Sequence, residues 1–204
     1  MKYYKVKKGS HIFNPVSFPW LPRVKLYPCI DNKIFSVEFE LTESAKYKMQ
    51  LASGQYDKDQ YDWNIKIAPH SFGFPFNKDA VMAAVRYNPI TDLFELTCYS
   101  NNDYSFRFGT DDNQVMLTGG AGRYKWTATK LSDGVSWKME LSGFINNEWV
   151  YSQAIHKMRK DFEFIVVAPD WFGGDNNETG EYGGVSPQDI KIGITLQSKE
   201  IINA

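Results

Sequence analysis

The chain has 204 residues, a length that one domain can fill, so a core of ordinary size can form without a metal or disulfide staple. Its 23 Lys and Arg residues nearly balance 24 Asp and Glu residues, and the formal net charge of -1 lacks the basic excess typical of proteins that bind nucleic acid or anionic lipid. We therefore expect neither a nucleic-acid partner nor a membrane partner.

Apolar and polar residues alternate in segment after segment along the chain. Between Phe35 and Leu41 every second residue is apolar, which is the period of a strand with one buried face. The segments with this pattern, in chain order, are 35–41, 63–67, 94–98, 104–108, 135–141, 162–166 and 190–196. Aromatic residues, at 16% of the chain, also favour strands over helices.

Residues 79–87 form the one segment whose Ala and Met content would also suit a short helix. We expect a strand, because residues 88–92 are typical of a hairpin turn that leads into the next strand. Asp133-Gly134 predicts another hairpin, through a type I′ turn, and Asn146-Asn147 predicts a further one.

A sheet with one apolar face must bury that face against another sheet or close on itself. The sequence therefore predicts an all-β fold: a single domain over residues 1–204, built as a two-sheet antiparallel β-sandwich of jelly-roll type. Cys29 and Cys98 are too few for a disulfide framework, and we expect both to be reduced, partly buried thiols.

Three segments spread over nearly the whole chain resemble a family of small β-sandwich proteins from Bacteroidetes bacteria and the phages that infect them. The matching residues are Lys7-Lys8-Gly9-Ser10-His11-Ile12-Phe13-Asn14-Pro15, then Asp59 to Asn64 with Val85-Arg86-Tyr87-Asn88, and finally Trp171-Phe172-Gly173-Gly174 with Ser186 to Ile192. The resemblance implies a concanavalin-like or laminin-G-like sandwich, with a binding or structural role more readily than a catalytic one. Members carry paired histidines where this chain has Phe74-Pro75-Phe76-Asn77, so no histidine role is carried over.

Aromatic and polar side chains are interleaved between Gln55 and Asn77, and Trp171-Phe172 is a second aromatic group. A flat ring can stack on the apolar face of a sugar while amides and carboxylates bond to its hydroxyls, so both groups are candidates for glycan recognition. The candidate residues are Tyr61, Asp62, Trp63, Asn64, His70, Phe72, Trp171 and Phe172. The alternative interpretation is that Trp63 alternates with Ile65 and Ile67 and lies with them in the core.

The segment from Asp170 to Gln188 mixes glycines with Asp, Asn and Glu residues. Oxygen ligands at this density could hold Ca²⁺, with Asp175, Asn176 and Glu178 as the candidate metal ligands. The spacing of an EF-hand is absent, and a solvated loop is the simpler interpretation. No other cofactor is expected.

No motif of a common enzyme class is present, whether for a nucleophile elbow, a zinc protease or a phosphate loop. His11, His70 and His156 lie in unrelated local contexts. Glu38 and Glu40 project from the same face of one predicted strand and could form a glycosidase pair, but alternating Glu is more typical of a solvated face. We therefore predict no catalytic residues.

The expected function is that of a non-enzymatic structural or binding protein, a phage particle component in a fibre, tail or head-decoration role that also touches glycans. No apolar stretch of a secretory signal follows Met1 to Lys8, which suits a virion protein released by lysis, or otherwise a cytoplasmic one. The expected partners are other virion proteins or copies of the chain itself, because unpaired sheet edges favour assembly. The alternatives are a free-standing carbohydrate-binding protein and a glycan hydrolase or lyase on the same fold.

Overall fold

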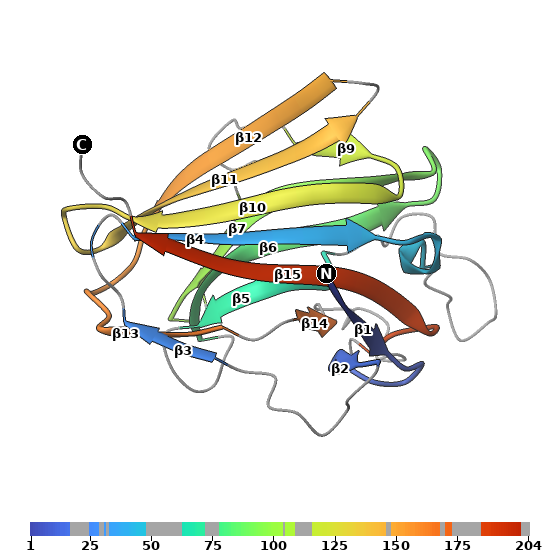
Figure 1. Ribbon diagram of the computed structural model, residues 1–204, viewed down its shortest axis with the longest axis horizontal. Coiled ribbons are helices and arrows are strands. Elements are labelled where there is room, and N and C mark those ends of the chain that lie inside the picture. The colour runs from blue at the N-terminus through green and yellow to red at the C-terminus, as the bar shows by residue number, and fades with distance from the viewer. Residues whose placement is uncertain are drawn as a thin grey trace.

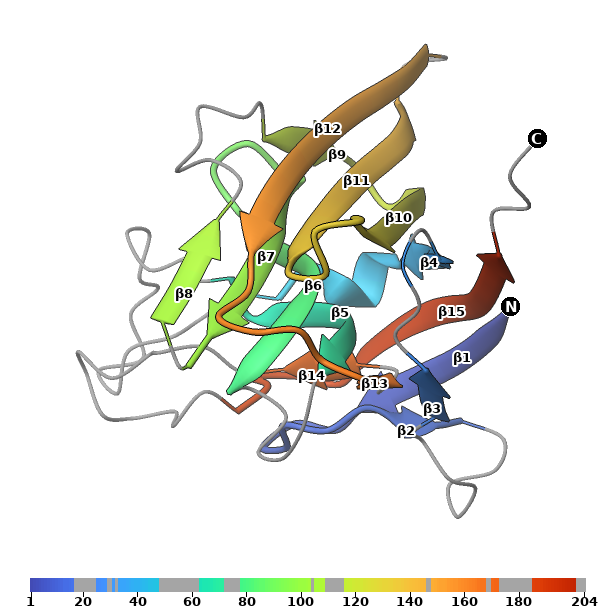
Figure 2. The ribbon, with the colours of Figure 1, turned by 90° about the vertical axis from the view of Figure 1, so that its left-hand side faces the viewer.

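The computed structural model describes residues 1–16, 25–28, 31, 33–47, 63–71, 78–103, 105–108, 116–145, 148–167, 170–172 and 185–200. In these ranges every element is a strand except one short 3-10 helix, Glu43–Ala45. The strands form two sheets that lie face to face, as Figures 1 and 2 show. The prediction of an all-β, two-sheet antiparallel sandwich is confirmed. The described part contains no helix long and apolar enough to span a membrane.

The first sheet has seven strands, in the spatial order β12-β11-β10-β4-β15-β1-β2. Neighbouring strands can come from distant parts of the chain, since β4 lies between β10 and β15. The strands are β1 (Lys2–Val6), β2 (Asn14–Pro15), β4 (Lys33–Leu41), β10 (Gly122–Lys130), β11 (Ser136–Ile145), β12 (Glu148–Lys157) and β15 (Ile190–Glu200).

The second sheet has eight strands, with the order β3-β13-β5-β6-β7-β8 and two further short strands, β14 paired with β5 and β9 paired with β7. Its strands are β3 (Lys25–Pro28), β5 (Ile65–Ser71), β6 (Asp79–Asn88), β7 (Leu93–Asn102), β8 (Ser105–Phe108), β9 (Leu117–Gly119), β13 (Phe164–Val167) and β14 (Asp170–Phe172). The register of β5 against β6 shifts between Ile67 and His70, around Pro69, which has no N–H to give to the ladder.

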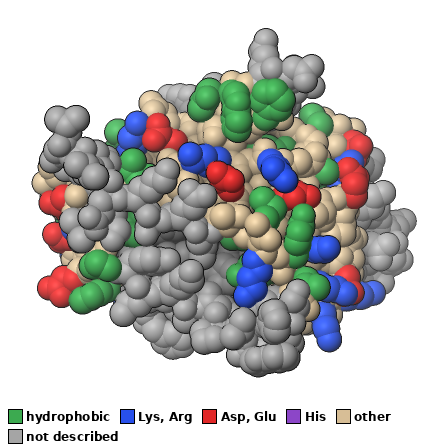
Figure 3. All heavy atoms as spheres, in the orientation of Figure 1, with side chains coloured by type: hydrophobic (Ala, Val, Ile, Leu, Met, Phe, Trp, Pro, Cys, Tyr) green, Lys and Arg blue, Asp and Glu red, His purple; other side chains and the backbone are tan. Residues whose placement is uncertain are grey.

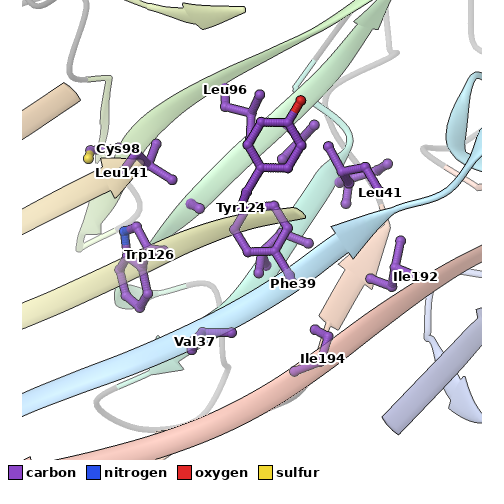
Figure 4. Packing of buried hydrophobic residues seen from close by; sticks show 14 of the residues in the cluster. Val37, Phe39, Leu41, Leu96, Cys98, Tyr124, Trp126, Leu141, Ile192 and Ile194 are labelled. Atoms are coloured by element: carbon purple, nitrogen blue, oxygen red, sulfur yellow. The ribbon is translucent and has the colours of Figure 1, made fainter. Parts of the chain in front are cut away.

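The main core lies between the two sheets. Phe39 of β4 stacks on Tyr124 of β10, with ring centroids 5.6 Å apart. Figure 4 shows the Tyr124 ring beside Leu96 of β7, from the facing sheet, and Cys98 of the same strand beside Leu141. Burying one such apolar side chain contributes about 1.5–3 kcal/mol to the free energy of unfolding. Cys98 is a free, buried cysteine, and burial raises the pKa of its thiol to about 12. Cys29 lies outside the described residues.

The segment with helix-like composition is strand β6, as predicted. Its odd-numbered residues, such as Val81 and Val85, face the main core. Its even-numbered residues Ala80, Met82 and Ala84 are buried as well, in a second cluster on the outward face of the sheet. Small side chains on a strand that is buried on both faces account for the composition.

The hairpins form where they were predicted, with one difference in turn type. β10 and β11 pair antiparallel around Asp133-Gly134. Only Gly134 of the pair has a positive φ, of 74°, and its N–H donates to the carbonyl of Leu131. A type I′ turn needs positive φ at both central residues, so that prediction is wrong and the bend centres on Ser132-Asp133. β11 and β12 also pair antiparallel, although Asn146-Asn147 between them lies outside the described residues.

Two of the three segments that carry the family resemblance meet in the fold. β1 pairs with β15, and beyond this pair the N–H of Gly9 donates to the carbonyl of Ser186 while the N–H of Ser186 donates to that of Ser10. Lys5 forms an ion pair with Asp189, at 2.5 Å, and its hydrogen bond lowers the pKa of that carboxyl. These residues join the first strand of the chain to the last described strand.

Candidate functional site

A polar-aromatic cluster covers the outward face of the eight-stranded sheet; we define it as Trp63, Lys66, Arg86, Glu95 and Tyr99. Arg86 of β6 and Glu95 of β7 are register partners and form an ion pair through the Arg86 Nε atom. Asn88 Nδ2 donates to the other carboxylate oxygen of Glu95 at 2.8 Å. Both oxygens of this carboxylate, which is only 6% exposed as a residue, therefore have donors.

Two cation–π contacts connect the cluster to its aromatic rings. The Arg86 guanidinium carbon lies 4.4 Å from the centroid of the Trp63 ring, and Lys66 Nζ lies 4.2 Å from that of Tyr99. Lys66 Nζ also donates to the carbonyl of Trp63 at 2.5 Å, and the Tyr99 hydroxyl donates to Asn101 Oδ1 at 3.0 Å. Each charge is held by a named partner, so the arrangement fixes these side chains in place.

Trp63 is buried, 8% exposed, but it does not lie where the alternation placed it. β5 begins at Ile65, so Trp63 precedes the strand and the period of two does not extend to it. It packs with Tyr99 and the alanines of the second cluster, on the opposite face of the sheet from Ile65 and Ile67. The interpretation that Trp63 shares the main core with these isoleucines is wrong, and its glycan contact stays a prediction.

Asn64 is fully buried, and among the residues that the structure describes neither atom of its side-chain amide has a hydrogen-bond partner. An amide in this situation costs about 1–3 kcal/mol of stability. Of the other predicted glycan residues, Tyr61, Asp62 and Phe72 lie outside the described residues.

The structure brings the backbones of the two predicted aromatic groups together. β14 pairs with β5, so that Trp171 is the register partner of Lys66 and Phe172 that of Ile65. His70 lies further along β5, opposite Val81 and Val167. The side chains of His70, Trp171 and Phe172 are outside what the structure describes. The paired residues are more than 100 residues apart in the chain, and nothing in the sequence signalled this pairing.

The candidate calcium ligands Asp175, Asn176 and Glu178 also lie outside the described residues, so the calcium prediction stays a prediction. In the ranges given above, no group of three or more His, Cys, Asp or Glu side chains is placed to hold a metal ion.

A buried Ser–His contact, which no sequence motif signals, joins the two sheets. Ser100 Oγ on β7 lies 2.6 Å from His156 Nδ1 on β12, and the two residues are 3% and 1% exposed. A serine nucleophile must reach a substrate carbonyl. This hydroxyl is enclosed by the core, so the contact supports the packing of the sheets and not catalysis.

A second contact between the sheets is an ion pair at the end of the sandwich. Arg159, just after β12, donates from Nε and a terminal nitrogen to the two carboxylate oxygens of Asp79 on β6, at 2.9 and 2.8 Å. These hydrogen bonds lower the pKa of the Asp79 carboxyl, and the backbone N–H of Asp103 lowers it further.

Glu38 and Glu40 lie on the outward face of the seven-stranded sheet, among charges of both signs (Figure 3). Glu38 is exposed, and Glu40 accepts a hydrogen bond from the Tyr3 hydroxyl at 3.0 Å. This is the solvated face that the alternation of glutamates indicated.

The same outward face carries an exposed aromatic surface at its end strands, which sequence reasoning missed. We define this surface as Phe144, Trp149, Tyr151 and Ile155, which are 56%, 54%, 69% and 55% exposed. Phe144 of β11 and Trp149 of β12 are register partners, with ring centroids 5.6 Å apart and planes tilted by 59°. Figure 3 shows hydrophobic side chains gathered at the top of this face, over these strands, while charges cover the middle strands.

No protein-family model matches the chain, and no curated protein matches it.

Proposed function

We propose that this protein is a non-enzymatic structural and binding protein that contacts glycans through its exposed aromatic surface, as a component of a phage particle. The observation that carries the proposal is the exposure of three aromatic rings, Phe144, Trp149 and Tyr151, on the outward face of two neighbouring strands. Trp149 and Tyr151 are each more than half exposed, although aromatic side chains contribute most to stability when they are buried.

The surface has the chemistry that sugars require. Aromatic ring faces can cover the C–H face of a pyranose ring, and Gln153 and Glu140 beside them offer amide and carboxylate groups for hydroxyls. Phe144 and Trp149 are held by the β11–β12 ladder, so little ordering of the protein is needed on binding.

Two further observations support a role without catalysis. The buried acids Glu95 and Asp79 are each held by an arginine, and the buried Ser100–His156 contact is closed off by the core. The role in a particle is supported by the resemblance of three segments to proteins of Bacteroidetes and their phages. This role in a particle is what distinguishes the proposed virion component from a free-standing carbohydrate-binding protein.

The glycan contact is tested on an array of immobilised bacterial and animal glycans, followed by titration with the best soluble oligosaccharide. We expect Trp149→Ala and Tyr151→Ala each to weaken binding by about two- to tenfold, since one aromatic stacking contact is worth about 0.5–1.5 kcal/mol. The matched control is Phe164→Ala, because Phe164 is similarly exposed, at 53%, but lies on β13 of the other sheet. Binding that survives both surface substitutions, or no binding at all, contradicts the proposal.

The particle role is tested separately, by mass spectrometry of particles purified from a lysate of the cell that carries the gene. We expect this chain at a fixed ratio to the other particle proteins. Glycan binding without any trace of the chain in the particles would instead support the free-standing carbohydrate-binding protein.

A further inference from the structure

β12 is the end strand of the seven-stranded sheet, and in the described part of the chain no strand pairs with its outer edge. It has ten residues, whereas the other end strands are short: β2 has two residues, and β3 and β8 have four each. β2 and β3 also end in proline, and β8 carries Arg107. Short length, proline and charge protect sheet edges from pairing with another chain. β12 is long and contains no proline, so it lacks two of these protections.

The hydrogen-bond register shows which backbone groups of β12 point outward. The N–H of Met158 donates to the carbonyl of Val135 at 2.8 Å, in the same register that pairs Ser136 with Lys157. Hydrogen-bonded pairs alternate along an antiparallel ladder, so the even-numbered residues of β12 bond to β11 and the odd-numbered residues turn their N–H and C=O groups away from it. The carbonyl of Lys157 agrees with this assignment, because it accepts a hydrogen bond from Asn102 Nδ2 on the other sheet.

The edge that remains runs from Trp149 to Ile155 and contains no charged residue. The charges of the strand lie at its two ends, since Glu148 begins it and Lys157 ends it. When two such strands align antiparallel, the negative end of each meets the positive end of the other. Parallel alignment would bring like charges together, so the charge distribution fits an antiparallel second copy.

We propose that β12 pairs antiparallel with β12 of a second copy of this chain, so that the two seven-stranded sheets become one continuous sheet with two-fold symmetry. Pairing centred on Ser152 gives every outward residue from Trp149 to Ile155 a partner. In this register Trp149 lies opposite Ile155 of the second copy, and Tyr151 lies opposite Gln153. An aromatic residue opposite a β-branched one is a favourable cross-strand pair.

This pairing goes beyond the proposed function and does not depend on it. It uses the edge of the sheet and leaves the outward face open, so the exposed aromatic surfaces of the two copies become neighbours across the two-fold axis. Glycan binding and pairing are measured separately, and either can fail alone.

The first test measures the molar mass by light scattering after size-exclusion chromatography. We expect twice the chain mass of 23.5 kDa for the natural sequence. Gln153→Pro removes an outward N–H without removing a bond to β11, and we expect it to elute at the single-chain mass. The control Gln153→Ala keeps this N–H and stays dimeric. A single-chain mass for the natural sequence at the highest concentration tested overturns the proposal, as does a dimer that folded Gln153→Pro leaves intact.

The second test uses the natural sequence alone, so its result does not depend on whether the proline variant folds. Amide hydrogen exchange of the natural sequence is measured by NMR at high and at low protein concentration. We expect the outward N–H groups of Tyr151 and Gln153 to exchange at least tenfold more slowly at high concentration, while those of Ser152 and Ala154, bonded to β11, do not change. Equal behaviour of the two sets overturns the pairing.

Discussion

Trp63 and Trp149 both lie outside the main core, one on the outward face of each sheet, yet Trp63 is 8% exposed and Trp149 is 54% exposed. Trp63 lies against the alanines of β6 and under the Arg86 guanidinium. Trp149 lies on β12, the end strand of its sheet, and its ring packs against that of Phe144. On the outward face of the eight-stranded sheet, the tryptophan is buried and contributes to stability. On the outward face of the seven-stranded sheet, the tryptophan is exposed and can contact other molecules.

The largest expected effect comes from truncating the buried ring. Trp63→Ala removes a large apolar side chain from the second cluster, and we expect the free energy of unfolding to fall by about 3–5 kcal/mol in a urea titration. Trp149→Ala is the matched control and should change it by about 0.5 kcal/mol or less. Equal losses for the two variants would mean that the faces do not differ in the way described.

A smaller loss is expected from the ion pair of the polar-aromatic cluster. Glu95→Gln keeps the shape of the side chain but removes the charge that Arg86 faces in a half-buried site. We expect a loss of about 1–3 kcal/mol, measured by urea unfolding. Arg86→Met in the Glu95→Gln background should cost less than Arg86→Met alone, because no unpaired carboxylate remains. Additive losses would contradict the coupling.

The ion pair between Asp79 and Arg159 joins the two sheets and makes the free energy of unfolding depend on pH. Because the folded-state pKa of Asp79 lies below its ordinary value of 3.8, its stabilisation is fully present above that value and is lost as the pH falls through the lower folded-state pKa. Asp79→Asn should therefore lower stability by about 1 kcal/mol at neutral pH, since Arg159 is partly exposed, and much less in strong acid. Thermal unfolding at pH 7 and below pH 3 measures the difference, and a constant difference would contradict the assignment.

The smallest effect on stability is expected on the exposed aromatic surface. Tyr151→Ala removes a side chain that is 69% exposed, so the free energy of unfolding should change by about 0.5 kcal/mol or less. The same variant should bind glycan more weakly, by the factor given above. A large loss of stability in urea would show that Tyr151 is covered in solution by something other than the pairing described above.

The sequence was sufficient for the fold class because the signal is local. The period of two in β4 and β15, and the turn after β6, depend on neighbouring residues only. Turn type at Asp133-Gly134 was not predictable, because the Asp133 carboxylate accepts hydrogen bonds from the backbone N–H groups of Val135 and Ser136, which favour a different bend.

The sites were less predictable because burial depends on what lies opposite. Along β12 the apolar residues Tyr151 and Ile155 face outward, while Ser152 and His156 face the core, which is the reverse of what alternation indicates. His156 can be buried between the sheets because Ser100, 56 residues away, forms a hydrogen bond with it. The sequence likewise contained no sign that Arg86 and Glu95 form a pair, since the β6–β7 register places them opposite each other.

The place of β15 between β4 and β1 has a consequence for how the protein forms during synthesis. β4 leaves the ribosome early, but one of its two neighbours consists of residues 190–200. Until that stretch emerges, β1 and β4 have no partner between them, while the eight-stranded sheet can already assemble around the β6–β7 hairpin. At about 5–20 residues per second, one edge of β4 lacks its β15 partner for several seconds or more after β4 is synthesised, an interval in which a chaperone can bind that unpaired edge.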